Sequence, residues 1–467
     1  MTDIRSLAAK TVYRITTEGA YTTIALDEAL SSLGSERAHA ADDRRLLSAL
    51  VHLTISHLGS IDSELVRLSG RPLSKIKPRL LPYLRIGLCQ LMYMDRIPEY
   101  AAVSATVAAV RKSSLKGLAG FVNGVLRNAA RNLAAVRDAQ GHLPETLVEE
   151  WRERDYPDWL KEKLAGAYGK ERMKAFLKVF SEPKPLSVRI NPLKAALADR
   201  LLLENYSPTQ GRLLPDVFYL AEPPELSDWA ALQEGQVTVQ DEASCLAAYL
   251  TGVMPGQKVL DLCAAPGGKS CCMAGMMQNE GRIESRDLYE HRVKLMEENA
   301  ERLGVTIMHC EAKDATVPAE ADSEAYDCVL LDAPCSGLGT LRSKPDILLT
   351  KTEQDLEEIA ALQRTLLETA ARAVKKGGRL VYSTCTLLPE ENEEQVEAFL
   401  KAHPEFEEED LKDRLPGAAP DANPLGAMSG EATSGFSEED GCLHKHLTLF
   451  PVSGGHDGFF VSSFTKH

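Results

Sequence analysis

Two cysteines stand where predicted strands end, and their side chains could provide a nucleophile. Cys335 lies in LLDAPCSGLGT, three residues beyond Asp332, and Cys385 lies in VYSTCTLLPEEN. Each follows an aliphatic run, in a turn rich in proline, serine or threonine. A lone buried cysteine is usually a core residue. Two cysteines at matching strand ends instead favour a catalytic pair.

A thiolate can carry out one demanding reaction on a pyrimidine ring. When it adds to carbon 6 of cytosine, the ring becomes an enamine whose carbon 5 can take a methyl group from a sulfonium. The proton on carbon 5 then leaves and the thiol is eliminated. Because a free cysteine has a pKa of about 8.5, the nucleophile needs nearby positive charge or a hydrogen-bond donor. Asp332 could hydrogen-bond the polar edge of the base, which must be unpaired or flipped out of its stack.

A glycine-containing turn precedes the two cysteine motifs. The run KVLDLCAAPGGKS (258–270) predicts a strand, a tight turn of small residues and a helix. Gly267 and Gly268 allow the backbone to approach a ligand where a Cβ would collide. The turn lacks the GxGxxG spacing of dinucleotide-binding folds and the first glycine of a phosphate-binding loop. Taken alone, it could be only a structural turn.

Three acidic residues at predicted strand ends indicate which ligand this turn could bind. Asp287 ends the second predicted strand, 18 residues after Lys269, Asp314 follows the third, and Asp332 ends the fourth. In an open parallel sheet, ligands bind outside the carboxyl ends of the strands. A crevice lined with acids repels a nucleotide polyphosphate. It suits S-adenosylmethionine, a nucleoside attached to a cation.

A parallel sheet is needed to bring these residues together. Short β-branched or aliphatic runs predict strands at 257–263, 281–288, 306–313, 326–333 and 377–384, with helices between them. This alternation predicts a doubly wound, Rossmann-like α/β sheet.

Further elements are expected around the sheet and before it. Segments 447–452 and 458–464 predict antiparallel edge strands, and 415–441, rich in Gly, Pro, Ala, Ser and acid, predicts a mobile surface insertion. Helical patterns at 79–94, 100–113 and 119–134 predict an all-helical first domain. Three regions therefore follow one another: a helical domain at 1–140, a small mixed α/β adaptor at 145–235 with a short strand in PKPLSVRINPLK, and the α/β domain at 236–467.

Charge is distributed unevenly along the chain. Residues 1–140 carry 19 Lys and Arg against 12 Asp and Glu, whereas the remainder carries 34 against 56. Arg127 and Arg131 lie one helical turn apart in the basic region. A basic domain fits an RNA-phosphate contact surface, because neutralising phosphates releases counterions. Ordinary surface charge explains the same excess equally well.

The composition excludes several other classes of protein. With 467 residues, 44% of them hydrophobic, the chain can form two or three domains with buried cores. No apolar run approaches the roughly 18 residues of a membrane span, and the first residues contain no apolar signal region. None of the ten cysteines forms a CxxC pair, which argues against zinc and against a disulfide framework. We expect a monomeric cytoplasmic protein that binds neither a membrane nor a metal.

Several motifs resemble one enzyme family in the expected order. DLCAAPGGKS (261–270), DAPCSGLGT (332–340) and YSTCTLLPEENE (382–393) resemble the cofactor, fourth and sixth motifs of RNA cytosine-C5 methyltransferases. VQDEAS (239–244) and DGFFVSSF (457–464) extend the match. The segments RIPEYAAVSATVAAV and GFVNGVLRNAARN are similar to the helical RNA-binding domain of the antitermination factor NusB. The combination resembles the RsmB (Sun/Fmu) family of bacterial 16S ribosomal RNA methyltransferases.

This resemblance implies a role for each matching residue. The cofactor S-adenosylmethionine would be held by the turn residues Cys263, Ala264, Ala265, Pro266, Gly267, Gly268 and Lys269, by Asp287 at the ribose, by Asp314 at the adenine, and by Asp332, which would also bind the target base. Cys385 would be the nucleophile and Cys335 the elimination partner, although DNA cytosine methyltransferases attack from the PC motif. The implied substrate is 16S ribosomal RNA, free or in an early assembly particle, at the family's usual target, cytosine 967.

Other functions remain open at this point. A ribosome-assembly factor with an inactive methyltransferase core would be expected to lack a catalytic cysteine, and both cysteines are present. A methyltransferase for exocyclic amines would carry an Asn/Asp-Pro-Pro-aromatic motif, and the turn here reads Asp-Ala-Pro-Cys. A transfer-RNA target is harder to exclude, because the catalytic core would look the same.

Overall fold

A computed structural model describes residues 3–33, 40–196, 203–415, 440–443 and 445–467. The chain divides into two compact units. The first contains Met1–Ser181 together with Leu341–Lys351, and the second contains Glu182–Thr340 and Thr352–His467. The division at 181/182 falls inside the region 145–235 predicted to be an adaptor, and the three-region division of the sequence remains a prediction. Most of the predicted insertion 415–441 lies outside the described residues.

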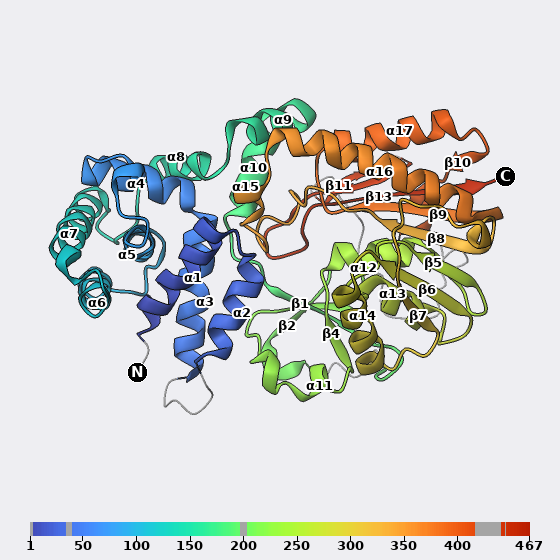
Figure 1. Ribbon diagram of the computed structural model, residues 1–467, viewed down its shortest axis with the longest axis horizontal. Helices are drawn as coiled ribbons and strands as arrows, with labels where there is room; N and C mark the ends of the chain where they lie inside the picture. Colours follow the sequence, from blue (N-terminus) through green and yellow to red (C-terminus); the bar gives the residue numbers. More distant parts are fainter. Residues whose placement is uncertain (1–2, 34–39, 197–202, 416–439, 444) are drawn as a thin grey trace. The chain divides into compact units, whose positions relative to one another are not determined.

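The first unit is helical, as predicted, and is built around α5 (Leu81–Tyr93) (Figure 1). Every residue of α5 from Pro82 to Met92 is buried. Its apolar side chains belong to one hydrophobic core to which the surrounding helices also contribute. The remaining helices of this unit are α1 (Ile4–Glu18), α2 (Thr22–Ser31), α3 (Ala40–Ser56), α4 (Leu58–Ser69), α6 (Glu99–Arg111), α7 (Ala119–Val136), α8 (Glu145–Asp155), α9 (Asp158–Tyr168), α10 (Lys170–Phe180) and α15 (Ile347–Thr350).

Local sequence sets the ends of these helices. Asp3 begins α1 because its side chain accepts hydrogen bonds from the free amides of Arg5 and Ser6. Gly19 ends the same helix in the left-handed conformation, with φ at 72°. Two polar residues are buried inside α5 with partners. The Arg85 guanidinium pairs with Asp62 at 2.7 Å, and the Gln90 amide donates to the carbonyl of Ile86.

The second unit begins with a small antiparallel sheet. Its strand order is β2-β3-β1-β4, with β1 (Leu186–Ile190), β2 (Pro208–Gln210), β3 (Val217–Leu220) and β4 (Val237–Val239). The strand predicted in PKPLSVRINPLK is thus confirmed as β1. Buried Glu242, at the start of α12 (Glu242–Leu250), accepts hydrogen bonds from the amides of Leu213 and Leu214 and from the Tyr219 hydroxyl.

The main sheet of the second unit has the predicted parallel core. The strand order is β11-β12-β13-β9-β8-β5-β6-β7, and β10 pairs with β13. All pairs from β9 to β7 are parallel, whereas β13 runs antiparallel to β9, β12 and β10. The strands are β5 (Lys258–Asp261), β6 (Arg282–Asp287), β7 (Met308–Ala312), β8 (Tyr326–Asp332), β9 (Val374–Thr384), β10 (Phe406–Glu408), β11 (Gly441–Leu443), β12 (Leu447–Leu449) and β13 (Phe459–Lys466).

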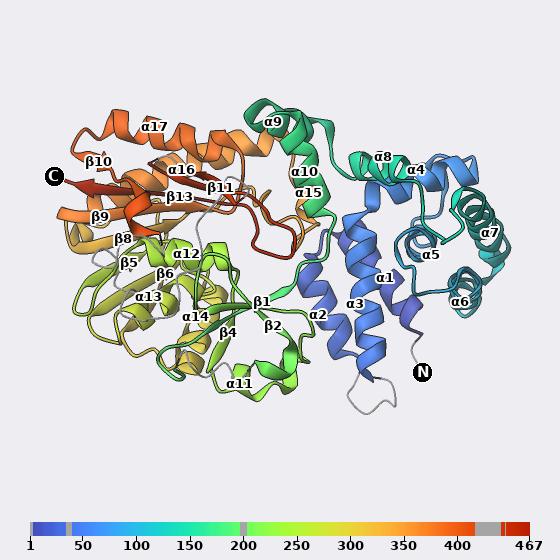
Figure 2. The same ribbon diagram turned by 180° about the vertical axis from the view of Figure 1, so that it is seen from behind.

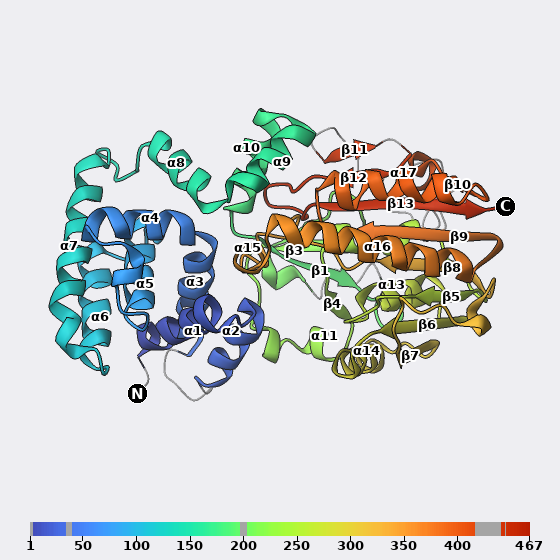
Figure 3. The same ribbon diagram turned by 45° about the horizontal axis from the view of Figure 1, so that its top comes forward.

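Helices cover both faces of this sheet (Figure 3). Adjacent residues of β5 point to opposite faces of the sheet. Val259 belongs to the core under α12, α13 (Gly268–Met276) and α14 (Glu290–Leu303). Leu260 belongs to the core under α16 (Glu353–Ala373) and α17 (Glu393–Ala402). In the sheet, β6 and β7 lie on one side of β5, and the later strands β8 and β9 lie on its other side. The order therefore reverses between β5 and β8, where such sheets bind ligands.

Candidate active site

The two predicted cysteines meet at the carboxyl ends of β8 and β9. These strands are direct neighbours, as predicted, and the Sγ atoms of Cys335 and Cys385 lie 3.2 Å apart. The backbone amide of Cys385 also donates to the Cys335 sulfur at 3.3 Å. Both cysteines are partly accessible to solvent. The geometry therefore presents two thiols at the same edge of the sheet.

The two thiols are chemically unequal. The hydrogen bond with Cys385, together with burial, raises the pKa of Cys335 well above its ordinary value. Cys335 therefore keeps its proton and can donate it toward the sulfur of Cys385. A thiol that receives such a hydrogen bond is the better placed of the two to ionise, because the bond stabilises its thiolate form.

An ion pair lies beside the thiols. The Lys269 ammonium, at the start of α13, contacts the Asp332 carboxylate at 2.7 Å, and the Ser383 hydroxyl donates to the other oxygen of Asp332 at 2.9 Å. Burial alone would lower the pKa of Lys269, but attraction to Asp332 and, less strongly, to Cys385 raises it. The ammonium also lies 5.1 Å from the centre of the Phe459 ring, a cation–π distance. Lys269 is thus a fixed positive charge at this edge of the sheet.

The turn between β5 and α13 is shaped for close approach. Gly267 has φ at 96°, a conformation that favours glycine. A Cβ on Gly268 would lie 3.3 Å from Nε2 of Gln240. That Nε2 atom is buried and has no hydrogen-bond partner among the residues that the structure describes. Gln240 accepts instead at Oε1, from buried Arg189 at 3.2 Å, so its amide donor is aimed at the glycine turn. Cys263, Ala264, Ala265 and Pro266 form most of the remainder of this turn, which begins at Leu262 directly after β5.

Asp287 lies at the end of β6, as predicted, and is held in place there. Its carboxylate is buried, contacts the Arg292 guanidinium at 3.1 Å and accepts the amide of Tyr289 at 3.3 Å. Arg292 also donates to the carbonyl of Ala265 at 3.2 Å. One arginine therefore links the predicted ribose-binding acid to the turn that is predicted to hold the cofactor.

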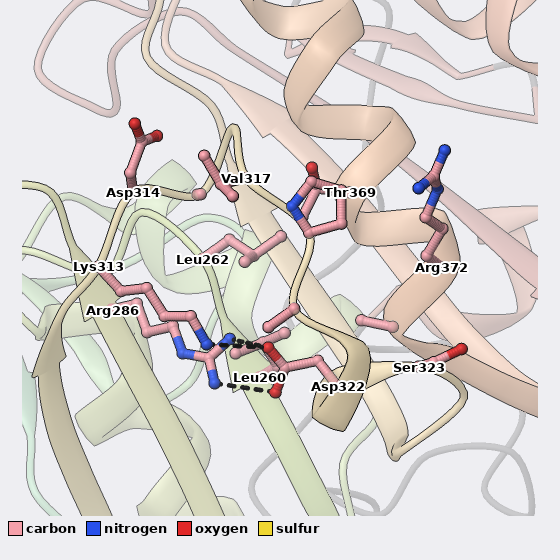
Figure 4. A pocket seen from close by; sticks show the side chains of 14 residues that line it. Leu260, Leu262, Arg286, Lys313, Asp314, Val317, Asp322, Ser323, Thr369 and Arg372 are labelled. Atoms are coloured by element: carbon pink, nitrogen blue, oxygen red, sulfur yellow. Dashed lines mark hydrogen bonds and ion pairs between the residues drawn. The ribbon is translucent and has the colours of Figure 1, made fainter.

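Asp314 follows β7 and is exposed. Its carboxylate accepts the amide and hydroxyl of Thr316 at 2.8 and 2.6 Å, and these hydrogen bonds lower its pKa. The loop lines a small cavity in which Arg286 donates twice to Asp322, at 2.8 and 2.9 Å (Figure 4). Asp314 points away from this ion pair in Figure 4. Lys313, which precedes Asp314, also donates to Asp322 at 3.1 Å, so this ion-pair cluster holds the start of the loop that carries Asp314.

Three neighbours of the site were not predicted from the sequence. Gln240 and Phe459 lie inside motifs that matched the family, which was the available signal. Glu391 also lies inside a matching motif, YSTCTLLPEENE (382–393), but nothing in its acidic run distinguishes Glu391 from Glu390. Among the described residues, no group of three His, Cys, Asp or Glu side chains is arranged to hold a metal ion. In the same part of the chain, no helix has both the length and the apolar character to cross a membrane.

The chain is similar to known methyltransferases over its whole length. Residues 248–465 match the 16S rRNA methyltransferase RsmB/F family, and residues 2–131 match the NusB family. The probable ribosomal RNA small subunit methyltransferase B of Bacillus subtilis is 35% identical over 470 residues, covering 100% of this chain and 99% of that relative. The corresponding Synechocystis protein is 32% identical and covers 100% of both chains. Among solved structures, PH0851 matches with a TM-score of 0.78 and 26% identity, covering 100% of this chain and 99% of that one.

Proposed function

The chain belongs to the RsmB/F family of 16S rRNA methyltransferases, and from this premise we propose that it methylates carbon 5 of a cytosine in 16S ribosomal RNA. The family's usual target, cytosine 967, is the position we propose. The observation that carries the proposal is the pair of thiols 3.2 Å apart at the ends of neighbouring strands. An enzyme that methylates an amine or a hydroxyl group has no use for two cysteines at this position, whereas addition to a pyrimidine ring requires a thiolate.

S-adenosylmethionine is the proposed methyl donor, and the residues at the site fit it. The donor supplies a methyl group on a positively charged sulfur. Gly267 and Gly268 leave room beside the free amides of the first turn of α13. The unpartnered Nε2 of Gln240 adds a further donor there, so this end of the crevice suits the carboxylate of the methionine part. Asp287 would hold the ribose and Asp314 the adenine.

The cysteines would divide the reaction between them. Cys385 adds as a thiolate to carbon 6 of the cytosine, forming a carbon–sulfur bond and making carbon 5 electron-rich. Once Cys385 is bonded to carbon 6, Cys335 loses its own proton to solvent. After carbon 5 has gained the methyl group, the Cys335 thiolate takes the proton from carbon 5. The electron pair of that bond forms the double bond between carbons 5 and 6, the bond to Cys385 breaks, and Cys385 leaves as a thiolate. Asp332, held by Lys269 and Ser383, would hydrogen-bond the polar edge of the base.

The first unit offers a surface for ribosomal RNA. Arg127 and Arg131 are exposed on α7, and Arg71 lies 5.2 Å from the Phe121 ring of the same helix. That contact brings the 71–79 segment, with its exposed Lys75, Lys77 and Arg79, alongside α7. We expect these cations to neutralise RNA phosphates. The Arg127→Ala, Arg131→Ala double variant should weaken RNA binding and lower the slope of log affinity against log salt by about 2. Lys10→Ala, which removes an exposed cation from α1, is the control. An unchanged slope would contradict this role.

The central experiment measures where the methyl group goes. The protein, with tritiated S-adenosylmethionine and 16S RNA transcribed in vitro, should label one cytosine, which bisulfite sequencing locates. Label in DNA, or on an amine, would overturn the proposed function, and a strong preference for transfer RNA would redirect the substrate. Cys385→Ala should abolish turnover and the covalent adduct. Cys335→Ala should accumulate a stable protein–RNA adduct. Exchanged phenotypes would reverse the two proposed roles.

A further inference from the structure

Glu391 is a buried acid of the Cys385 motif whose side chain contacts the motif of Cys335. Its side chain is fully buried, and its Oε2 accepts the amide of Ser336 at 2.8 Å and Nε2 of Gln363 at 3.1 Å. Its second carboxyl oxygen, Oε1, is also buried and has no hydrogen-bond partner within the described part of the chain. The reaction steps proposed above do not use this carboxyl group.

Burying a carboxyl group at this position is energetically unfavourable. Burial raises the pKa of Glu391, which means that the ionised form is disfavoured there. Among the described residues, the main groups that oppose this effect are hydrogen-bond partners of Glu391, led by Ser336, and none of them is a cation. Glutamine has the same shape and could accept the same amide of Ser336 without the cost of burying a charge. Fold stability therefore gives no reason for an acid here, so a role in the chemistry of the site is the better explanation.

The contacts of Glu391 hold Cys335 from both sides. Ser336, whose amide it accepts, follows Cys335 in the chain. Gln363, which donates to Glu391, also donates to the carbonyl of Pro334 at 3.0 Å, and Pro334 precedes Cys335. A further hydrogen bond connects the Cys335 turn with the Cys385 motif, because the hydroxyls of Ser336 and Thr386 lie 2.9 Å apart.

We propose that Glu391 is a positioning residue for Cys335, which fixes its sulfur beside Cys385 and sets the readiness of Cys335 to take the proton from carbon 5. The inference rests on the proposed function, because it assigns Glu391 to the release step of that reaction. Glu391 also acts on Cys335 through its charge. The pKa of Cys335 is raised mainly by the hydrogen bond with Cys385 and by burial, and repulsion from Glu391 adds a smaller contribution. A negative charge on this side of the pair increases the affinity of the Cys335 sulfur for a proton, which suits a group that takes one from carbon 5.

The test separates attack from release in Glu391→Ala and Glu391→Gln variants. With saturating S-adenosylmethionine and transcribed 16S RNA, the rate of adduct formation should stay within about twofold of wild type in both variants, because Cys385 is intact. Release should slow at least about tenfold in Glu391→Ala, so that the adduct accumulates. Glu391→Gln should restore most of the release rate, and its pH profile should move down by at least about half a unit, because a neighbouring negative charge is gone. Glu394→Gln, exposed at the start of α17, is the control.

Three outcomes would overturn the inference. They are wild-type release in Glu391→Ala, an equal loss of attack and release in that variant, or a release profile in Glu391→Gln that coincides with wild type. If Glu391→Ala does not fold, the pH profile of Glu391→Gln decides alone. A wild-type protein that forms no adduct at all contradicts the proposed function instead, so the two failures are distinguishable.

Discussion

Replacing Lys269 by methionine should separate the electrostatic role of this residue from its packing. Methionine retains an unbranched chain of similar length, so it fills the same space and removes the charge. The change leaves Asp332 without its partner at 2.7 Å, while the hydrogen bond from Ser383 remains. Cys385 then loses an attractive cation and faces an unpaired carboxylate. We expect its thiolate to form less readily.

The size of this effect follows from the arrangement of charges. An opposite charge within about 4–6 Å moves a titration by about 1–3 pH units. Because Asp332 already neutralises much of the field of Lys269, the lower end of that range applies, which is about one unit. One unit corresponds to about 1.4 kcal/mol. Adduct formation near neutral pH should therefore be roughly tenfold slower in Lys269→Met.

The assay is the single-turnover rate of adduct formation between pH 6 and 10, with saturating S-adenosylmethionine and transcribed 16S RNA. The half-maximal rate should move to higher pH by about one unit, and the maximal rate at high pH should be largely retained. Lys269→Arg keeps the charge and should keep the wild-type midpoint. A loss of rate that is the same at every pH would refute the electrostatic reasoning and would make Lys269 a packing or donor-binding residue only.

Three further predictions concern the framework of the site. Gly339→Ala should reduce adduct formation by at least about a hundredfold, measured by the same assay, because a Cβ would lie 2.3 Å from the carbonyl oxygen of Gly458. Glu409→Gln should destabilise the fold by about 3 kcal/mol in urea titrations at pH 7, because hydrogen bonds, including those from Arg379, overcome burial and lower the pKa of Glu409 from 4.5 to about 2. The stability difference should narrow as the pH falls from about 4.5 toward 2, and a constant difference would contradict the prediction. Burial raises the pKa of Asp261 from 3.8 to about 7, so wild type should lose stability as the pH rises through that window, and Asp261→Asn should not.

The sequence was most informative where chain order determines spatial order. Parallel strands end at one edge of their sheet, so two cysteines that follow predicted strands had to share that edge. Neighbouring positions for β8 and β9 then followed from the usual doubly wound arrangement, and the strand order confirms this. The five strands and the helices at 79–94, 100–113 and 119–134 were predictable because each has its own apolar pattern.

Features that depend on tertiary pairing were not predictable. Strands β10 and β11 have three residues each, too few to show an alternating apolar pattern. They form because β10 pairs with β13 and β11 pairs with β12. The segment Leu341–Lys351 follows the Cys335 motif in sequence but belongs to the first compact unit. The contact between Lys269 and Asp332 joins residues 63 positions apart. No local pattern encodes such a contact.

The assignment of the two cysteines depends on the charges on either side of them, more than on either thiol alone. Lys269 carries a positive charge that interacts with Cys385, and Glu391 carries an acid that repels a thiolate at Cys335. At 3.2 Å the two sulfurs cannot both be ionised at low cost, so one must hold the proton. Both neighbours favour the same distribution, with the thiolate on Cys385 and the proton on Cys335. If Cys335 attacked first, its thiolate would form beside the acid that repels it, so the arrangement supports Cys385 as the nucleophile.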